Sequence, residues 1–384
     1  FTEAGTVPWM MIAAAAMAAP KLHFCTGIAV AFPRSPMVSA QIAWELAQNT
    51  RGRFRLGLGS QVRGHIVRRY GALWDKPAPQ MRDYVSAFKA CIRAFRGEEK
   101  LHHEGPYYSL SLLPGQWAPP RHAFEDVKID ISAVGPQMCR VAGELCDGVH
   151  VHPMHSMRYI ETRLLPELAA GAAKAGRSVA EIDLIVPVFA IPGDTPEERA
   201  RMIQIARTQI AFYGSTPNYA FQFDDLGFPG TTAKLGALMK AGDIGGMAAA
   251  INDEMLEHFA LVARWDDLAD ALIARYAGKA ARVVSYLAMG DIQEHPDHLA
   301  RWGEIAKAVR AAKDRGTDPL GGEREQAPGR PAHRPAHQSG DGRIPHPGAE
   351  RRPQPRRAAR RGQPAASDRA ARADDQALRP DGQR

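Results

Sequence analysis

The sequence predicts an α/β protein of the (β/α)8 barrel class, and three observations lead to this prediction. Short apolar runs alternate with helical patterns over about 300 residues, which is typical of a parallel sheet whose strands are joined by helices. The segment 128–151 reads strand, glycine turn, helix and strand, in about the shortest span that a parallel crossover allows. With 384 residues, of which 45% are hydrophobic, the chain can bury a large core.

The apolar runs define six expected strands, which are Leu22–Ala31, Arg53–Gly59, Lys128–Val134, Gly148–His152, Ile182–Ile191 and Ala281–Met289. Helical patterns lie between and after them, at Pro36–Asn49, Gln80–Arg96, Pro136–Cys146, Met157–Ala175, Thr195–Tyr213, Trp265–Ala277 and Pro296–Ala312. A barrel of this class needs eight strands. Six strands and a stub at Phe1–Glu3 therefore predict that the first βα unit is missing.

Two segments interrupt this rhythm. Residues 214–258 are rich in aromatic residues, glycine and short helical patterns, and we expect them to form an insertion that serves as a lid or pocket wall before the last strand. Residues 316–384 contain no aromatic residue, and Arg, Pro and Ala dominate them. Such a composition cannot build a core, so we expect a barrel over residues 1–315 and a disordered tail after it.

The composition excludes some partners. The segment 316–384 has 14 arginines and 9 acidic residues, so it carries +5 of the chain's net +7 and leaves only +2 on the body. This distribution disfavours nucleic-acid binding. The four cysteines show no paired short spacing and fit a reducing cytoplasm. No apolar run is long enough to cross a membrane, and a homodimer remains open.

The turn Val134-Gly135-Pro136 follows an apolar strand and begins a helix. Gly135 allows bare backbone to approach a ligand, and Pro136 suits the first turn of a helix. The next free N–H groups lie at the positive end of the helix dipole, where phosphate groups bind. The alternative is an ordinary βα turn that needs glycine only for its geometry.

Small residues also end the strand Arg53–Gly59. Gly57 and Gly59 are spaced to share one face, and small residues at strand tips leave room for a flat ring against the backbone. Glycine at a strand end is also common turn chemistry, and the spacing alone does not decide between these two readings.

Several segments together resemble the luciferase-like monooxygenase superfamily. They are Thr26-Gly-Ile-Ala-Val-Ala-Phe-Pro-Arg-Ser-Pro-Met-Val-Ser-Ala-Gln41, Gly52-Arg-Phe-Arg-Leu-Gly-Leu-Gly59, Ala133-Val-Gly-Pro136 and Ala142-Gly-Glu-Leu-Cys-Asp-Gly148. The runs Gln209–Pro217 and Asn252–Leu256 are similar to the branch that uses coenzyme F420, a 5-deazaflavin. The resemblance spans about Phe1 to Met289. It implies a barrel with an insertion and a cofactor at the carboxyl ends of the strands.

The resemblance also implies cofactor-binding residues in three places. Gly27–Ile28 match a non-prolyl cis peptide that forms a bulge behind the deazaflavin ring in relatives. Gly59 and Ser60 match the strand tip at the ring edge. The turn that holds the cofactor phosphate matches Ala133, Val134, Gly135, Pro136 and Gln137.

The chain also departs from the pattern of its relatives. They often carry His or Asp near the position of Thr6-Val7 and an acidic residue after the Gly59 turn, where Gln61 and Val62 stand here. The resemblance therefore assigns no proton-transfer residue, and the catalytic residues stay unknown.

Three histidines follow the expected phosphate helix. His150 and His152 project to the same side of their strand, and His155 follows them. This pattern allows half of a metal site in a hydrolase, a contact to cofactor or substrate, or plain packing. A hydrolase site needs further ligands from later strands, and Asp291 is the one acidic residue near the end of the last expected strand, so we predict no metal.

The sequence thus predicts a cytoplasmic F420-dependent oxidoreductase. Its reaction would be hydride transfer between C5 of the deazaflavin and an unknown small organic substrate. Three alternatives remain: an FMN-dependent monooxygenase on the same barrel, a metal-dependent hydrolase, and a non-catalytic fragment.

Overall fold

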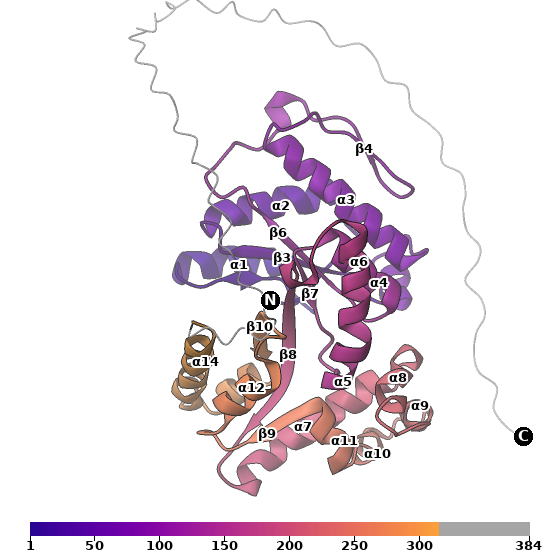
Figure 1. The fold of residues 1–384 in the computed structure, drawn as a ribbon, viewed down its shortest axis with the longest axis vertical. Coiled ribbons are helices and arrows are strands. Elements are labelled where there is room, and N and C mark those ends of the chain that lie inside the picture. The colour runs from indigo at the N-terminus through magenta and orange to yellow at the C-terminus, as the bar shows by residue number, and fades with distance from the viewer. Residues whose placement is uncertain (315–384) are drawn as a thin grey trace, which may run out of the picture. The chain divides into compact units, whose positions relative to one another are not determined.

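A computed structural model describes residues 1–314, with side chains up to Ala312, and shows an α/β fold with a mainly parallel sheet (Figure 1). The expected tail at 316–384 lies outside the described residues. The sheet contains β1 (Phe24–Cys25), β2 (Ala29–Val30), β3 (Phe54–Gly59), β6 (Lys128–Ser132), β7 (Gly148–His150), β8 (Asp183–Pro192), β9 (Ala260–Ala263) and β10 (Arg282–Ser285). A separate hairpin joins β4 (His103–Glu104) to β5 (Ser109–Leu110).

The strands of the sheet pair in parallel along the path β1-β3-β6-β7-β8-β10. β2 extends the edge at β3, where Val30 lies opposite Gly59. Within residues 1–314, no ladder joins β10 back to β1. Because all these strands run the same way, their carboxyl ends meet at one edge, where ligands bind in folds of this kind.

The fold class predicted from the sequence is confirmed, but the count of six strands was too low. β9 at Ala260–Ala263 pairs in parallel with the second half of β8, opposite Phe189–Pro192. β10 pairs with the first half of β8, opposite Ile185–Val188. β8 thus pairs first with β10 and then, further along its length, with β9. Figure 1 shows β8 as the long strand at the centre.

The start of the chain also differs from the expectation. The N–H of Gly27 donates to Phe1 O, and the N–H of Glu3 donates to Ile28 O, so the stub Phe1–Glu3 lies along the first expected strand. The helix α1 (Pro8–Ala18), which was not expected, follows the stub and packs on α2. The strand count behind the expected absence of the first βα unit was therefore too low, and that absence stays a prediction.

Helices cover the sheet, as the alternating sequence predicts. Besides α1, the larger helices before the insertion are α2 (Pro36–Asn49), α3 (Pro77–Phe95), α4 (Pro136–Leu145), α6 (Leu165–Lys174) and α7 (Pro196–Gly214). A short helix α5 (Met157–Tyr159) and a π-helical turn (Ile160–Leu164) lead into α6. The chain ends its described part with α12 (Leu268–Tyr276), α13 (Ala288–Glu294) and α14 (His298–Asp314). No helix within residues 1–314 is long and apolar enough to span a bilayer.

The last strand is shorter than the sequence predicted. It was predicted to reach Met289, whereas β10 ends at Ser285 and α13 begins at Ala288. Along β10, the exposed Arg282 and Val284 alternate with the half-buried Val283 and Ser285, as in a strand with one face towards solvent.

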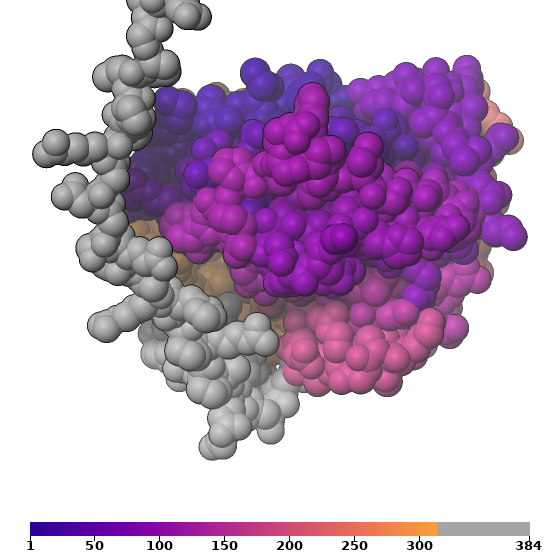
Figure 2. All heavy atoms as spheres, turned by 90° about the horizontal axis from the view of Figure 1, so that it is seen from above, coloured from indigo at the N-terminus to yellow at the C-terminus, as the bar shows by residue number. Residues whose placement is uncertain are grey.

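The expected insertion at 214–258 is helical. It contains a 3-10 turn (Pro217–Tyr219), α8 (Ala220–Asp224), α9 (Thr231–Lys240), α10 (Ile244–Ala249) and α11 (Asp253–Phe259). It lies between α7 and β9, so two strands follow it rather than one. In the space-filling view, the pink atoms of α7 and the start of the insertion lie at the edge opposite the indigo N-terminal part (Figure 2).

Two glycines let α4 and α6 cross closely, side by side in Figure 1. A Cβ on Gly143 would lie 2.2 Å from Leu168 O, and one on Gly171 would lie 2.1 Å from Arg140 O. Both obstacles are backbone atoms, which no side-chain rotation can move away. The crossing therefore fixes where α4 lies, and with it the helix N-terminus at the edge of the sheet.

We expect Gly171→Ala to lower the free energy of unfolding by about 1–3 kcal/mol, because the two helices must separate. Gly236→Ala in α9 is the matched control. Its Cβ would meet only Ser215 O at 3.7 Å, so it should stabilise the protein by about 0.5–1 kcal/mol, as alanine does in a helix interior. Urea unfolding followed by circular dichroism measures both changes. A stabilising Gly171→Ala would contradict the close crossing.

Candidate functional site

The bulge between β1 and β2 contacts the tip of β3. The peptide bond Gly27–Ile28 is cis, as the resemblance implied. A Cβ on Gly59 would lie 2.5 Å from Cδ1 of Ile28 and 2.9 Å from Oγ of Ser132. The structure therefore brings Ile28 and Gly59 together, and a larger residue at position 59 would have to displace the side chains of Ile28 and Ser132. Ser60 follows Gly59, and its Oγ donates to Gln61 O at 3.2 Å.

Ser132 is a site residue that the sequence reasoning missed. It is the last residue of β6, and its half-buried side chain contacts the Gly59 position across the strands. A serine at a strand end has no distinctive sequence signal. Only the pairing of β3 with β6 shows that Ser132 belongs to this surface.

The turn after β6 leaves the N-terminus of α4 uncapped and accessible. Gly135 is the N-cap residue with φ −80° and ψ 157°, no side chain caps the helix, and Pro136 occupies its first turn. Gly135, Pro136 and Gln137 are exposed, while Ala133 is buried. A Cβ on Gly135 would find no described heavy atom within 4 Å. This arrangement fits an anion, since free N–H groups and the positive end of the helix dipole face open space.

Tyr159 stabilises this turn through a hydrogen bond to its backbone. Its hydroxyl donates to Val134 O at 2.9 Å, and burial raises the pKa of Tyr159, so the hydroxyl stays protonated. Tyr159 lies in α5, and the side chain of Ser156 caps that helix by accepting from the N–H of Tyr159 at 3.1 Å. Local sequence patterns do not indicate this contact, because it joins segments 25 residues apart.

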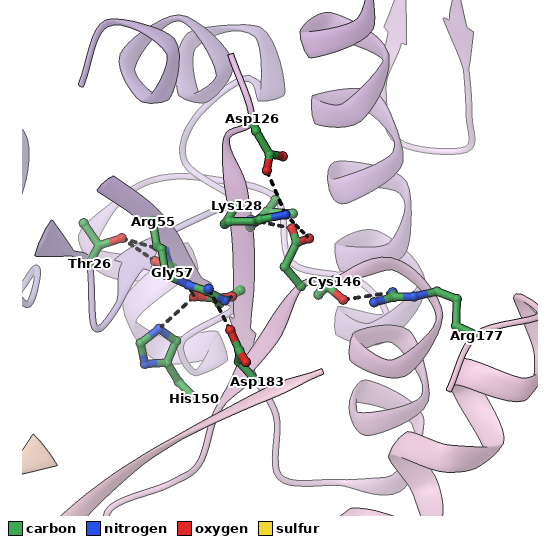
Figure 3. A network of polar contacts seen from close by, with 12 residues as sticks. Thr26, Arg55, Gly57, Asp126, Lys128, Cys146, His150, Arg177 and Asp183 are labelled. Carbon is green, nitrogen blue, oxygen red and sulfur yellow. Dashed lines mark hydrogen bonds and ion pairs between the residues drawn. The ribbon is translucent and has the colours of Figure 1, made fainter. Parts of the chain in front are cut away.

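A buried ionic network lies inside the sheet below these strand tips (Figure 3). Nε and Nη2 of Arg55 donate to the two oxygens of Asp130, at 2.9 and 2.5 Å, and Nη1 donates to Asp183 at 2.8 Å. Asp130 is fully buried. Burial raises the pKa of Asp130, and the hydrogen bonds from Arg55 oppose that rise. The network joins β3, β6 and β8, so it fixes the strands that present the site.

His150 lies beside this network, at the end of β7. A Cβ on Gly57 would come within 2.5 Å of its Nε2, and one on Gly27 within 3.7 Å of its Cε1. Nε2 is buried without a hydrogen-bond partner in residues 1–314, and it lies 3.9 Å from Oδ2 of Asp130. Burial lowers the pKa of His150 to about 4, with a further contribution from Arg55. His150 is therefore a neutral ring packed under the bulge.

The other two histidines contact aromatic and hydroxyl groups. His152 packs against Tyr213 and Tyr219, with ring centroids 4.7 and 4.6 Å apart. His155 is buried, and its Nε2 lies 3.2 Å from the hydroxyl of Tyr276. Within residues 1–314, no three His, Cys, Asp or Glu side chains converge as metal ligands.

Comparison with known proteins agrees with this geometry. The model of the luciferase-like monooxygenase family matches residues 2–282. An uncharacterized protein of Mycobacterium tuberculosis is 36% identical over 282 residues, which cover 73% of this chain and 83% of that protein. A 5,10-methylenetetrahydromethanopterin reductase of Methanolobus tindarius is 26% identical over 257 residues, with 66% and 73% covered.

Solved structures share the fold. The coenzyme F420-dependent tetrahydromethanopterin reductase of Methanopyrus kandleri has a TM-score of 0.60 at 20% identity, over 72% of this chain and 80% of that one. A riboflavin lyase solved with modified FMN has a TM-score of 0.56 at 13% identity, over 81% and 74%. The chain therefore belongs to the luciferase-like monooxygenase family, whose enzymes are oxidoreductases that use coenzyme F420 or a flavin.

Proposed function

We propose that this protein is an F420-dependent oxidoreductase that transfers a hydride between C5 of the deazaflavin and an organic substrate. The observation that carries the proposal is the pair of surfaces at one edge of the sheet. One is the bulge Gly27–Ile28 against Gly59, and the other is the open, uncapped N-terminus of α4. Together they offer a backbone surface for a flat ring and a site for its phosphate.

Each predicted residue has a role in this proposal. Gly27, Ile28, Gly59 and Ser60 would support the ring. Ala133, Val134, Gly135, Pro136 and Gln137 would form the phosphate turn, which Tyr159 stabilises through Val134 O. The bound cofactor would supply the hydride chemistry, and the protein would supply orientation and shelter from water.

Two observations support F420 over FMN as the cofactor. The curated relative from Methanolobus tindarius is named as a methylenetetrahydromethanopterin reductase, and a structural neighbour is named as an F420-dependent enzyme acting on that class of pterin. The second candidate is an FMN-dependent monooxygenase, which the riboflavin lyase favours because it holds modified FMN on the same fold.

A titration of the full chain with F420 and with FMN distinguishes the two. Quenching of intrinsic tryptophan fluorescence reports binding of either cofactor. We expect F420 to bind at least about tenfold more tightly, a difference of about 1.4 kcal/mol. Tighter binding of FMN would favour the monooxygenase, and saturation by neither cofactor would contradict both.

The variant Gly135→Val tests the phosphate turn. The new side chain has open space and a backbone conformation that valine tolerates, so the fold should persist while the branched side chain blocks the approach of a phosphate. We expect F420 affinity to fall by at least about 100-fold, or about 2.7 kcal/mol. Gly115→Val is the control, because Gly115 also has open space and lies in the exposed turn Gly115–Trp117. Equal affinities in the two variants would rule out the phosphate site.

A further inference from the structure

His152 lies at the carboxyl end of β7, two residues after the strand's last residue, His150. In extended chain, residues two apart face the same side. His150 faces the backbone of Gly27 and Gly57, so His152 should stand on that same side, one step nearer the carboxyl edge. This is the edge where the proposed cofactor surfaces lie.

Aromatic side chains from two other parts of the fold hold the ring of His152. Tyr213 from α7 meets it edge to face at 83°, and Tyr219 from the insertion lies tilted at 47°. The hydroxyl of Tyr213 lies 2.9 Å from that of Tyr286, just after β10. The ring is therefore clamped from its sides in a fixed orientation, as a group that binds a substrate must be.

The hydrogen bonds of His152 define which nitrogen carries its proton. The N–H of Met154 donates to Nδ1 at 3.1 Å, so Nδ1 is an acceptor and a neutral ring must carry its hydrogen on Nε2. Burial lowers the pKa of His152 to about 4, which keeps the ring neutral near pH 7. His155 secures the backbone, because its Nδ1 lies 2.9 Å from His152 O.

The one polar group of the His152 ring not yet accounted for is its Nε2–H. None of the hydrogen bonds found in residues 1–314 involves Nε2 of His152, and this atom is not among the buried unpartnered ones. A preorganised neutral imidazole N–H is a good partner for an oxygen that gains negative charge during a reaction.

We propose that Nε2–H of His152 donates a hydrogen bond to the carbonyl oxygen of a ketone or aldehyde substrate, or to the hydroxyl oxygen in the reverse direction. This inference rests on the proposed function. In the reduction, the carbonyl carbon accepts a hydride and a C–H bond forms. The π electron pair of the C–O bond moves to the oxygen, which takes a proton from water. Both electrons come from the reduced deazaflavin, which is thereby oxidised, and His152 keeps its proton throughout.

The first test is spectroscopic and needs no turnover. The full-length protein labelled with 15N-histidine should show a protonated Nε2 and an unprotonated Nδ1 for His152, unchanged between pH 6 and 9. Addition of cyclohexanone or acetophenone should shift the Nε2 resonance. A proton on Nδ1, or no shift with either ketone, would overturn the proposal.

The second test uses two variants of His152. His152→Phe keeps a ring between Tyr213 and Tyr219 but removes the donor, whereas His152→Gln keeps an N–H near the same place. The probes are the two ketones and their isosteric alkenes, methylenecyclohexane and α-methylstyrene. In the natural protein and in His152→Gln, the ketones should bind about 3- to 10-fold more tightly than the alkenes, as expected for one neutral hydrogen bond. In His152→Phe this preference should disappear.

Turnover gives the third measurement. For ketone reduction by reduced F420, His152→Phe should lower kcat by about 100-fold, the usual cost of losing one donor to a developing oxyanion. His152→Gln should recover at least part of that loss. A ketone preference that persists in His152→Phe would overturn the role of His152.

An F420 titration on the same samples separates the two proposals. If the natural protein fails to bind F420, the cofactor assignment is wrong. If F420 binds normally and the ketones show no preference over the alkenes, only the role of His152 is wrong.

Discussion

Acidification from pH 6.5 towards pH 4 should unfold this protein. Three histidines, the buried His150 and His155 and the half-buried His152, have pKa values lowered by burial from 6.5 to about 4. The unfolded chain takes up protons at these residues below pH 6.5, whereas the folded chain does not until about pH 4. The unfolded state therefore binds up to three more protons in this window, and the free energy of unfolding falls as the pH falls.

The expected slope is up to about 4 kcal/mol per pH unit near pH 5, since each ring contributes about 1.4 kcal/mol. Over the whole window this approaches the total stability of a typical domain, about 5–15 kcal/mol. Urea unfolding at pH 7.0, 6.0, 5.5 and 5.0 measures it. His150→Leu removes a ring whose Nε2 has no partner within residues 1–314, so it should reduce the slope by about one third. A stability that is constant from pH 7 to 5 would show that the histidines are not neutral in the folded state.

Asp130→Ala should lower the free energy of unfolding by about 3–5 kcal/mol, because it leaves Arg55 buried without its main partner. Asp130 accepts two hydrogen bonds from the guanidinium, whereas Asp183 accepts one and is partly exposed. Thermal or urea unfolding at pH 7 measures the loss.

Two controls show whether burial causes this effect. Glu99→Ala breaks the exposed ion pair with Arg93, in which both side chains are more than 40% exposed, and it should cost less than about 1 kcal/mol. The double variant Arg55→Met/Asp130→Leu removes both charges and should recover most of the loss. Similar costs for Asp130→Ala and Glu99→Ala would contradict a buried network.

Local signals in the sequence were sufficient for much of the fold. The helix Pro36–Asn49 has the predicted bounds because Ser35 caps it through the N–H of Met37 and Pro36 begins it. The turn at Gly135 could likewise be predicted from the sequence, since Pro136 marks the start of the helix. The cis bond at Gly27–Ile28 was predicted through the resemblance and is present.

Elements without periodicity were missed. The helix α1 carries apolar residues on all sides, so the sequence shows no helical face; it packs through Pro8, Ile12 and Ala16 while Met10 and Met17 stay exposed. The strand β9 has only four residues and directly follows a helix, so it gave no recognisable apolar run.

The candidate site shows the same division. The backbone conformations that glycine and proline favour are known from the residue type alone, so the sequence indicates the glycines and prolines of the cofactor surfaces. The surroundings of His152 have no such local signal, because Tyr213 from α7 and Tyr219 from the insertion contact it only in the folded structure. Such contacts depend on tertiary structure and have no signature in local spacing.

β8 pairs with β10 along its first half and with β9 along its second half, and this arrangement affects which parts of the sequence can change during evolution. The register of β10 is set by Ile185–Val188, so it does not depend on β9 or on the segment that leads to β9. The insertion can therefore change in length and sequence over evolutionary time while the first half of β8 keeps the remaining strands aligned. Tyr219 belongs to that segment. With His152 as the proposed substrate contact, remodelling of this one segment would change substrate preference while the surfaces proposed for the cofactor stay intact.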